Sequence, residues 1–136
     1  MDTTGQQSGS KPRVLIADDH AFIVHQRARS LRDAGYEVTP AFNGDDAFRY
    51  LDTVRFDYLV TDQFMPGKNG LDLVDFICAQ GWNTGIILIT SHHDNEEVLN
   101  RVRSYPKSTV MVKPVSAPKL LAQLAQLQAK AATANR

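Results

Sequence analysis

Acidic, hydroxyl and basic side chains follow four short apolar runs of this sequence. In chain order these side chains are Asp18 and Asp19, Asp62, Thr90, and Lys113. Three carboxylates brought together repel one another unless a cation lies between them. Oxygen ligands alone favour Mg²⁺, which also keeps several water molecules in its octahedral shell. The residue types therefore predict a magnesium site, provided that the fold brings the four runs together.

Asp62 is the candidate nucleophile of this group. A carboxylate can attack a phosphoryl group and form an aspartyl phosphate. It needs no general base, because it is already ionised at neutral pH. Phosphoryl transfer depends on positioning and charge neutralisation more than on covalent help. The Lys113 ammonium would add a positive charge to that of the cation, and the Thr90 hydroxyl can donate a hydrogen bond to a phosphoryl oxygen.

Alternating strands and helices must position these side chains. Short apolar runs predict strands at 13–17, 36–39, 58–61, 85–89 and 109–112. Helical patterns lie between and after them, from Ala21 to Gly35, from Asn43 to Val54, from Leu71 to Gly81, from about Asp94 to Ser104, and from about Ser116 onward. This alternation is typical of an α/β fold with a doubly wound parallel sheet and helices on both faces.

The commonest arrangement of five such units is the flavodoxin-like strand order 2-1-3-4-5. In that order strands 1, 3 and 4 are neighbours, and their carboxyl ends carry the acidic pair, Asp62 and Thr90. Strand 5 lies beside them and brings Lys113. Ligands of open parallel sheets bind at this edge, so the predicted fold gathers residues that are far apart in sequence into one site.

Length and composition limit the possible functions. The chain has 136 residues, the size of one domain, with 15 basic and 15 acidic residues and no net charge. We therefore expect no binding to nucleic acid or to a membrane. The single cysteine, Cys78, cannot form an internal disulfide, which fits a cytoplasmic protein. We predict a disordered tail at 1–11, one domain at 12–130 and a frayed tail at 131–136.

Four motifs resemble those of response-regulator receiver domains, the CheY-like family of two-component signalling. They are Val14–His20 with its acidic pair, Asp62 with Met65-Pro66-Gly67 and Gly70-Leu71, Ile89-Thr90-Ser91, and Val112-Lys113-Pro114. Each motif alone is weak, but all four occur in order and at predicted strand ends. The resemblance covers roughly residues 13–129, nearly everything except the tails.

The resemblance implies a role for each acidic residue. Asp62 would be the phosphoacceptor and also a ligand of Mg²⁺, for which Mn²⁺ could substitute. Asp19 would bind the cation directly, and Asp18 mainly through water. The backbone carbonyl of Phe64 would complete the protein ligands.

The resemblance also implies how the phosphoryl group is received and sensed. Thr90 would be the switch hydroxyl and Lys113 would pair with the phosphoryl group. The bond before the matching proline is cis in the family, so Lys113-Pro114 is a candidate cis peptide. The donor would be a phosphohistidine on a sensor histidine kinase or a histidine phosphotransfer protein.

The sequence departs from the family at one switch position. Members usually carry Tyr or Phe three residues before the lysine, where this chain has Val110, and Tyr105 does not occupy the matching position. In the family this aromatic ring swings inward when the switch hydroxyl moves toward the phosphoryl group, but a valine has no ring and is stiff at χ1. We hypothesise that loop movement instead remodels the output face, which helix 4, strand 5 and helix 5 form. Phe64 and His92, near the predicted site mouth, are candidates for tuning hydrolysis of the aspartyl phosphate.

The expected function is a phosphorylation-dependent signalling switch consisting of one receiver domain. With no second domain expected, output would come from binding an unknown downstream protein or from passing the phosphoryl group on. We expect no enzyme activity beyond self-catalysed phosphoryl transfer to and from Asp62, and a monomer or weak homodimer. The alternative within the family is a receiver that binds partners without being phosphorylated.

Two other functions fit less well. A phosphatase of the haloacid dehalogenase type needs a second acid two residues after the nucleophile, where this chain has Phe64. A flavin-binding module needs a phosphate loop after strand 1, and Asp18 and Asp19 would repel a phosphate there.

Overall fold

The computed structural model describes residues 10–91 and 95–134. Its strands are β1 (Arg13–Ala17), β2 (Glu37–Ala41), β3 (Tyr58–Asp62), β4 (Gly85–Thr90) and β5 (Ser108–Val112). Its helices are α2 (Ala21–Asp33), α3 (Gly44–Thr53), α4 (Gly70–Gln80), α5 (Glu96–Arg103) and α6 (Ala117–Ala134). Most of the predicted tail at 1–11 lies outside the described residues. The predicted boundary at residue 130 lies inside α6, which continues to Ala134.

All five strands are parallel and follow the order β2-β1-β3-β4-β5, which confirms the predicted doubly wound α/β sheet. The strands β3 and β4 are buried along their whole length, as expected for the centre of a sheet covered on both faces. The strand β2 continues through Pro40 to Ala41, two residues beyond its predicted end near 39. Proline is tolerated there because β2 is an edge strand, where its missing N–H has no partner to lose.

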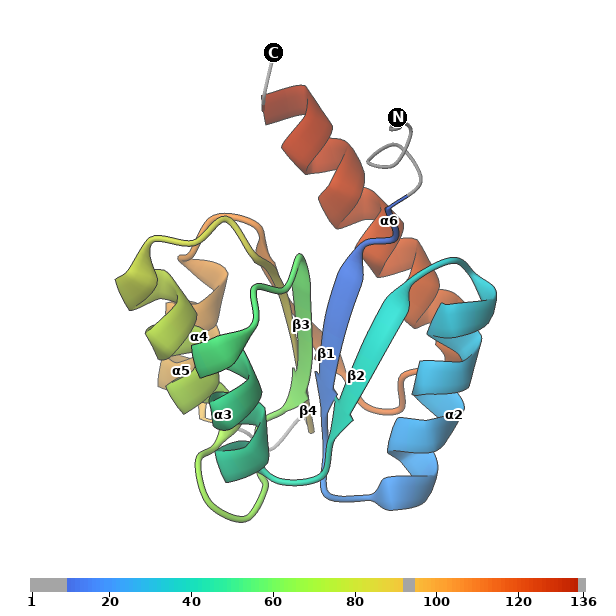
Figure 1. Cartoon of the computed structure of the whole chain (residues 1–136). Helices are drawn as coiled ribbons and strands as arrows, with labels where there is room; N and C mark the ends of the chain where they lie inside the picture. The colour runs from blue at the N-terminus through green and yellow to red at the C-terminus, as the bar shows by residue number, and fades with distance from the viewer. Residues whose placement is uncertain (1–9, 92–94, 135–136) are drawn as a thin grey trace.

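Helices cover the sheet in two groups, as Figure 1 shows. One face of the sheet packs against α2 and α6, in a core that includes Val24, Leu31 and Leu124. The other face packs against α3, α4 and α5, in a core that includes Leu51, Val74 and Leu99. Apolar side chains fill both faces, and the carboxyl edge of the sheet, where β1 and β3 end, lies at the lower side of Figure 1.

Short polar residues begin the helices that follow this edge. The Asn43 side chain accepts a hydrogen bond from the Asp46 N–H, and Asn69 and Asp72 form a capping box at the start of α4. Asn95 caps α5, so this helix begins at Glu96, two residues later than its predicted start near Asp94. None of the helices in the described ranges is long and apolar enough to cross a membrane.

The turn between β3 and α4 is held against its neighbours by backbone contacts. The Gly44 N–H donates to the carbonyl oxygen of Pro66 at 3.0 Å, which joins α3 to this turn. The buried Gln63 accepts from the Gly70 N–H at its backbone oxygen (2.9 Å) and from the Leu71 N–H at Oε1 (2.8 Å). These bonds fix the chain that follows Asp62, and so they fix the position of that carboxylate.

Candidate functional site

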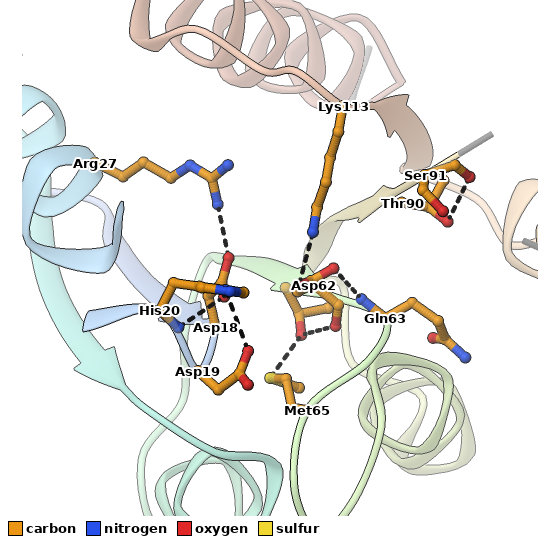
Figure 2. Close-up of polar contacts among 11 residues, drawn as sticks. Asp18, Asp19, His20, Arg27, Asp62, Gln63, Met65, Thr90, Ser91 and Lys113 are labelled. Carbon is orange, nitrogen blue, oxygen red and sulfur yellow. Dashed lines mark hydrogen bonds and ion pairs between the residues drawn. The ribbon is translucent and has the colours of Figure 1, made fainter. Parts of the chain in front are cut away.

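The predicted acidic residues meet at the carboxyl edge of the sheet. Asp18 and Asp19 follow β1 and Asp62 ends β3, and Asp18 and Asp62 are buried. One carboxylate oxygen of each, together with a ring nitrogen of His20, lies within 4.8 Å of the others. Figure 2 shows these side chains pointing toward one another from separate elements. The convergence predicted from strand order is therefore present in the structure.

Asp62 is held by one hydrogen bond on each carboxylate oxygen. Its Oδ1 accepts from the Gln63 N–H at 2.9 Å, and its Oδ2 accepts from the Lys113 ammonium at 3.0 Å. Lys113 itself follows β5, and its backbone N–H donates to the Thr90 carbonyl oxygen at 2.8 Å. The lysine follows β5 and the acceptor carboxylate ends β3, on either side of β4, and the two side chains meet at the sheet edge, as Figure 2 shows.

Opposing effects act on the acidity of Asp62. Burial raises its pKa above the ordinary value, because the charged form loses hydration. The hydrogen bond and the charge of Lys113 lower this pKa, the nearby Asp18 raises it, and the Gln63 N–H lowers it. The net result is a raised pKa, and Lys113 opposes this rise by favouring the ionised form of the buried nucleophile.

Asp18 has two partners that the sequence analysis did not identify. Its Oδ1 accepts from the His20 backbone N–H at 3.0 Å and lies 2.9 Å from the His20 Nδ1. Its Oδ2 lies 3.4 Å from the Arg27 guanidinium, which reaches across from α2. His20 immediately precedes α2, and its Nδ1 also lies 3.4 Å from Asp19.

A signal for Arg27 was present in the sequence. It stands in register with Val24, Ala28 and Leu31 on the inward face of α2, and all four residues are buried. A cation on the apolar face of a helix is rarely buried without a partner. An arginine in that position, nine residues after Asp18, therefore indicated an ion pair with an acid at the sheet edge.

The acidic environment of His20 gives a measurable prediction. The hydrogen bond to Asp18 and the charges of Asp18 and Asp19 raise the His20 pKa above 6.5. The stability from this contact is complete below that pH and is lost as the pH rises through the raised pKa. An NMR titration of the imidazole should show the raised pKa, and Asp18→Asn should move it back toward 6.5. An unchanged pKa in that variant would contradict this account.

The remaining predicted residues have different surroundings. Thr90 is buried, and its hydroxyl donates to the Ser91 carbonyl oxygen at 3.3 Å. Figure 2 shows this hydroxyl beside the site and turned toward Ser91. The Phe64 side chain is 64% exposed at the turn after β3. The Lys113-Pro114 peptide bond is cis, and His92 lies outside the described residues.

Val110 occupies a half-buried place in β5, opposite Leu88 of β4. Val110 and Tyr105 both pack against the apolar core that lies beneath α3, α4 and α5. The Tyr105 hydroxyl donates to Asp75 Oδ1 of α4 at 2.9 Å, and Arg101 of α5 lies 3.3 Å from the same carboxylate. The aromatic ring nearest in sequence to the switch position is therefore tied to α4.

The donor set fits a hard divalent cation. Three carboxylates within reach of one another supply oxygen ligands, and two of them are buried where an unpaired charge is unfavourable. Asp18, Asp19 and Asp62 are the residues that would hold the cation. Bound there, Mg²⁺ would neutralise the negative charge that collects around a phosphoryl group.

The fold and this site define a class of protein, a parallel α/β domain with an acidic, lysine-bearing edge suited to phosphoryl transfer. The model of the response regulator receiver domain matches residues 14–125. The chain therefore belongs to the response-regulator receiver-domain family. Phosphorylation-dependent signalling is general to this family, whose members generally bind Mg²⁺ and interact with histidine kinases or phosphotransfer proteins.

Individual relatives agree with the family assignment. A response regulator receiver protein of Anaeromyxobacter sp. (strain Fw109-5) is 35% identical over 80% of this chain and 45% of its own length. The transcriptional regulatory protein DltR of Streptococcus agalactiae is 30% identical over 82% of this chain and 50% of its own length. The chain thus spans about half the length of these curated relatives.

Solved structures show the same fold. The receiver domain of the Francisella response regulator 1452 superposes with a TM-score of 0.78 at 27% identity, covering 89% of this chain and 99% of that one. The chemotaxis response regulator CheY4 of Vibrio cholerae superposes with a TM-score of 0.76 at 28% identity, covering 87% of this chain and 99% of that one.

Proposed function

We propose that Asp62 accepts a phosphoryl group in a Mg²⁺-dependent reaction and that the chain acts as a signalling switch in the cytoplasm. The observation that carries this proposal is the buried Asp62 carboxylate, paired with Lys113 and grouped with Asp18 and Asp19. These three carboxylates and the Phe64 backbone carbonyl would hold the cation. Mn²⁺ is expected to substitute for Mg²⁺, because it also accepts oxygen ligands.

The proposed step exchanges one phosphorus bond for another. An Asp62 oxygen attacks the phosphorus atom of a phosphohistidine, a new O–P bond forms, and the N–P bond to the imidazole breaks. The electrons of that bond leave with the histidine nitrogen. Lys113, 3.0 Å from the nucleophile, is placed to neutralise the phosphoryl oxygens. Hydrolysis of the acyl phosphate resets the switch, and we propose no other catalytic activity.

A groove beside the site supports a protein donor. It has a volume of about 930 Å³ and runs between α2 and the chain after β5, with Ile23, Arg27, Lys113 and Pro114 among its lining residues. Phe22, on the first turn of α2, is 73% exposed nearby. Apolar and basic side chains next to the acceptor suit the phosphohistidine-bearing surface of a sensor kinase or phosphotransfer protein.

The output of the switch requires a route that does not use a swinging ring. Val110 has no ring, and the Tyr105 hydroxyl is bonded to Asp75. We propose that the Thr90 hydroxyl turns from Ser91 to the phosphoryl group, and that the accompanying backbone shift alters the surface of α5, β5 and α6. A downstream protein reads that surface, or the phosphoryl group is passed on.

Phosphorylation by a small donor tests this proposal. The protein is incubated with acetyl phosphate, with Mg²⁺ or with EDTA, and its intact mass is measured. We expect the gain of one phosphoryl group with Mg²⁺ and none with EDTA or in the Asp62→Asn variant. If neither acetyl phosphate nor a phosphohistidine protein modifies the chain, the alternative of a non-phosphorylated, partner-binding receiver replaces the proposal.

A further inference from the structure

We propose that Arg27 is a built-in counter-cation of Asp18, which stabilises the acidic site in the absence of metal and weakens the binding of Mg²⁺. This inference rests on the proposed function, because it concerns the affinity of the same site. Arg27 is a positioning residue in this account. It acts through Asp18 and sets the Mg²⁺ concentration at which the switch can be phosphorylated.

The geometry places a fixed positive charge inside the acidic cluster. Arg27 is 9% exposed and Asp18 is 1% exposed, and the guanidinium Nη1 lies 3.4 Å from Asp18 Oδ2. Figure 2 shows the guanidinium directed at this carboxylate from the side opposite Asp19. The other oxygen of Asp18 is occupied by His20. Both oxygens of the carboxylate therefore have partners before any cation arrives.

The surroundings of Arg27 hold it in this position. Its neighbours on the inward face of α2 are Val24, Ala28 and Leu31, whose apolar side chains carry no acceptor for the guanidinium. Burial lowers the pKa of Arg27, while the charges of Asp18 and Asp62 raise it. An arginine remains protonated at neutral pH even so. A buried charge of this kind is retained only where its partner remains in place.

Two effects on cation binding follow from this pair. First, the guanidinium repels a divalent cation bound by the neighbouring carboxylates. Second, Asp18 can bind the cation only if its carboxylate shares or gives up a contact with Arg27 or His20, and these contacts stabilise the metal-free protein. Without Arg27, the carboxylates would repel each other more strongly in the metal-free state, and the same change would make Mg²⁺ bind more tightly.

The test is a calorimetric titration with Mg²⁺ of wild-type protein and the Arg27→Met variant, which keeps an apolar stem and removes the charge. We expect Mg²⁺ to bind roughly tenfold more tightly to the variant. This is the lower end of the change in binding affinity that a nearby charge usually produces at a carboxylate. Thermal melts should show a lower midpoint than wild type without Mg²⁺ and a larger upward shift when Mg²⁺ is added. A merely structural role for Arg27 would leave the affinity unchanged or weaken it.

Two further variants control for charge and for folding. Arg29 is exposed on α2 and lines the same groove, so Arg29→Met removes one charge where solvent screens it. Its Mg²⁺ affinity should change by about twofold or less. Arg27→Lys keeps a cation and should restore an affinity near wild type. If Arg27→Met is unfolded without metal, the Mg²⁺ concentration that refolds it replaces the calorimetric reading.

The outcomes separate this inference from the proposed function. Tighter binding in Arg27→Met, with Arg29→Met and Arg27→Lys near wild type, supports the counter-cation role. Equal or weaker binding in Arg27→Met overturns it while leaving the metal site intact. A wild-type protein that binds no Mg²⁺ contradicts the proposed metal site itself.

Discussion

Replacing Lys113 with methionine is expected to slow phosphorylation of Asp62 by acetyl phosphate roughly a hundredfold or more, the usual effect of removing a preorganised donor. One cause is the loss of the positive charge that neutralises the phosphoryl oxygens. The other is a change in the nucleophile. The hydrogen bond and the charge of Lys113 both lower the pKa of Asp62, so without them burial raises that pKa further. A larger fraction of Asp62 is then protonated and unreactive.

The pH dependence of the rate separates these two causes. In Lys113→Met, raising the pH should restore the part of the rate that was lost to protonation, while the part due to the missing charge should persist. Lys119→Met removes an exposed lysine from the first turn of α6 and is the matched control. A wild-type rate in Lys113→Met would show that the ion pair of Asp62 with Lys113 has no part in the chemistry.

Replacing Gly44 with alanine is expected to destabilise the protein by about 3 kcal/mol or more, at the upper end of the range for overpacking. An added Cβ would overlap the carbonyl oxygen of Lys68 and lie 2.5 Å from its carbonyl carbon. These are backbone atoms, so α3 and the turn after β3 must move apart. That movement would break the hydrogen bond from the Gly44 N–H to Pro66.

Urea denaturation of the Gly44→Ala variant measures this effect. Gly81→Ala is the comparison, because that residue has a φ of 73° and no atom within 4 Å of an added Cβ. Its expected destabilisation is only that of a left-handed residue, about 1 kcal/mol. If the two variants lost the same free energy of unfolding, the close approach of α3 to the turn after β3 would not be the reason for glycine at position 44. A slower phosphorylation of Gly44→Ala would follow from displacement of the turn that carries Phe64.

The strands and their order could be predicted because each of them ends an apolar run. Strands buried on both faces have no polar residues until they reach the sheet edge, so Asp18, Asp62 and Thr90 mark where β1, β3 and β4 end. Parallel connection then forces these ends to one edge. The acidic cluster is thus a consequence of topology, and no knowledge of side-chain contacts is needed to expect it.

The partners of Asp18 could not be derived in the same way. His20 lies in a connecting segment, and its ring contacts Asp18 because of the backbone conformation before α2. Arg27 lies on α2, and its spacing from Val24, Ala28 and Leu31 puts it on the inward face of that helix. Arginine is usually exposed, so helical periodicity and residue type give opposite expectations for its position.

The orientation of the Thr90 hydroxyl also lies beyond sequence reasoning. A hydroxyl rotates to whichever acceptor is close, and here it donates to Ser91. The sequence identified the residue but not its partner. In the same way, the absence of an aromatic residue at Val110 was evident from the sequence, whereas the bond between Tyr105 and Asp75 depends on how α4 and α5 pack.

Mapping the phosphoryl group to a single residue tests the central claim most directly. The protein is phosphorylated with acetyl phosphate and Mg²⁺, the acyl phosphate is reduced with borohydride, and the peptides are sequenced by mass spectrometry. We predict that the reduced residue is Asp62 and that the Asp62→Asn variant yields no reduced peptide. A modification found instead at Asp18 or Asp19, or a phosphoryl group on His20, would contradict the assignment of Asp62 as the acceptor.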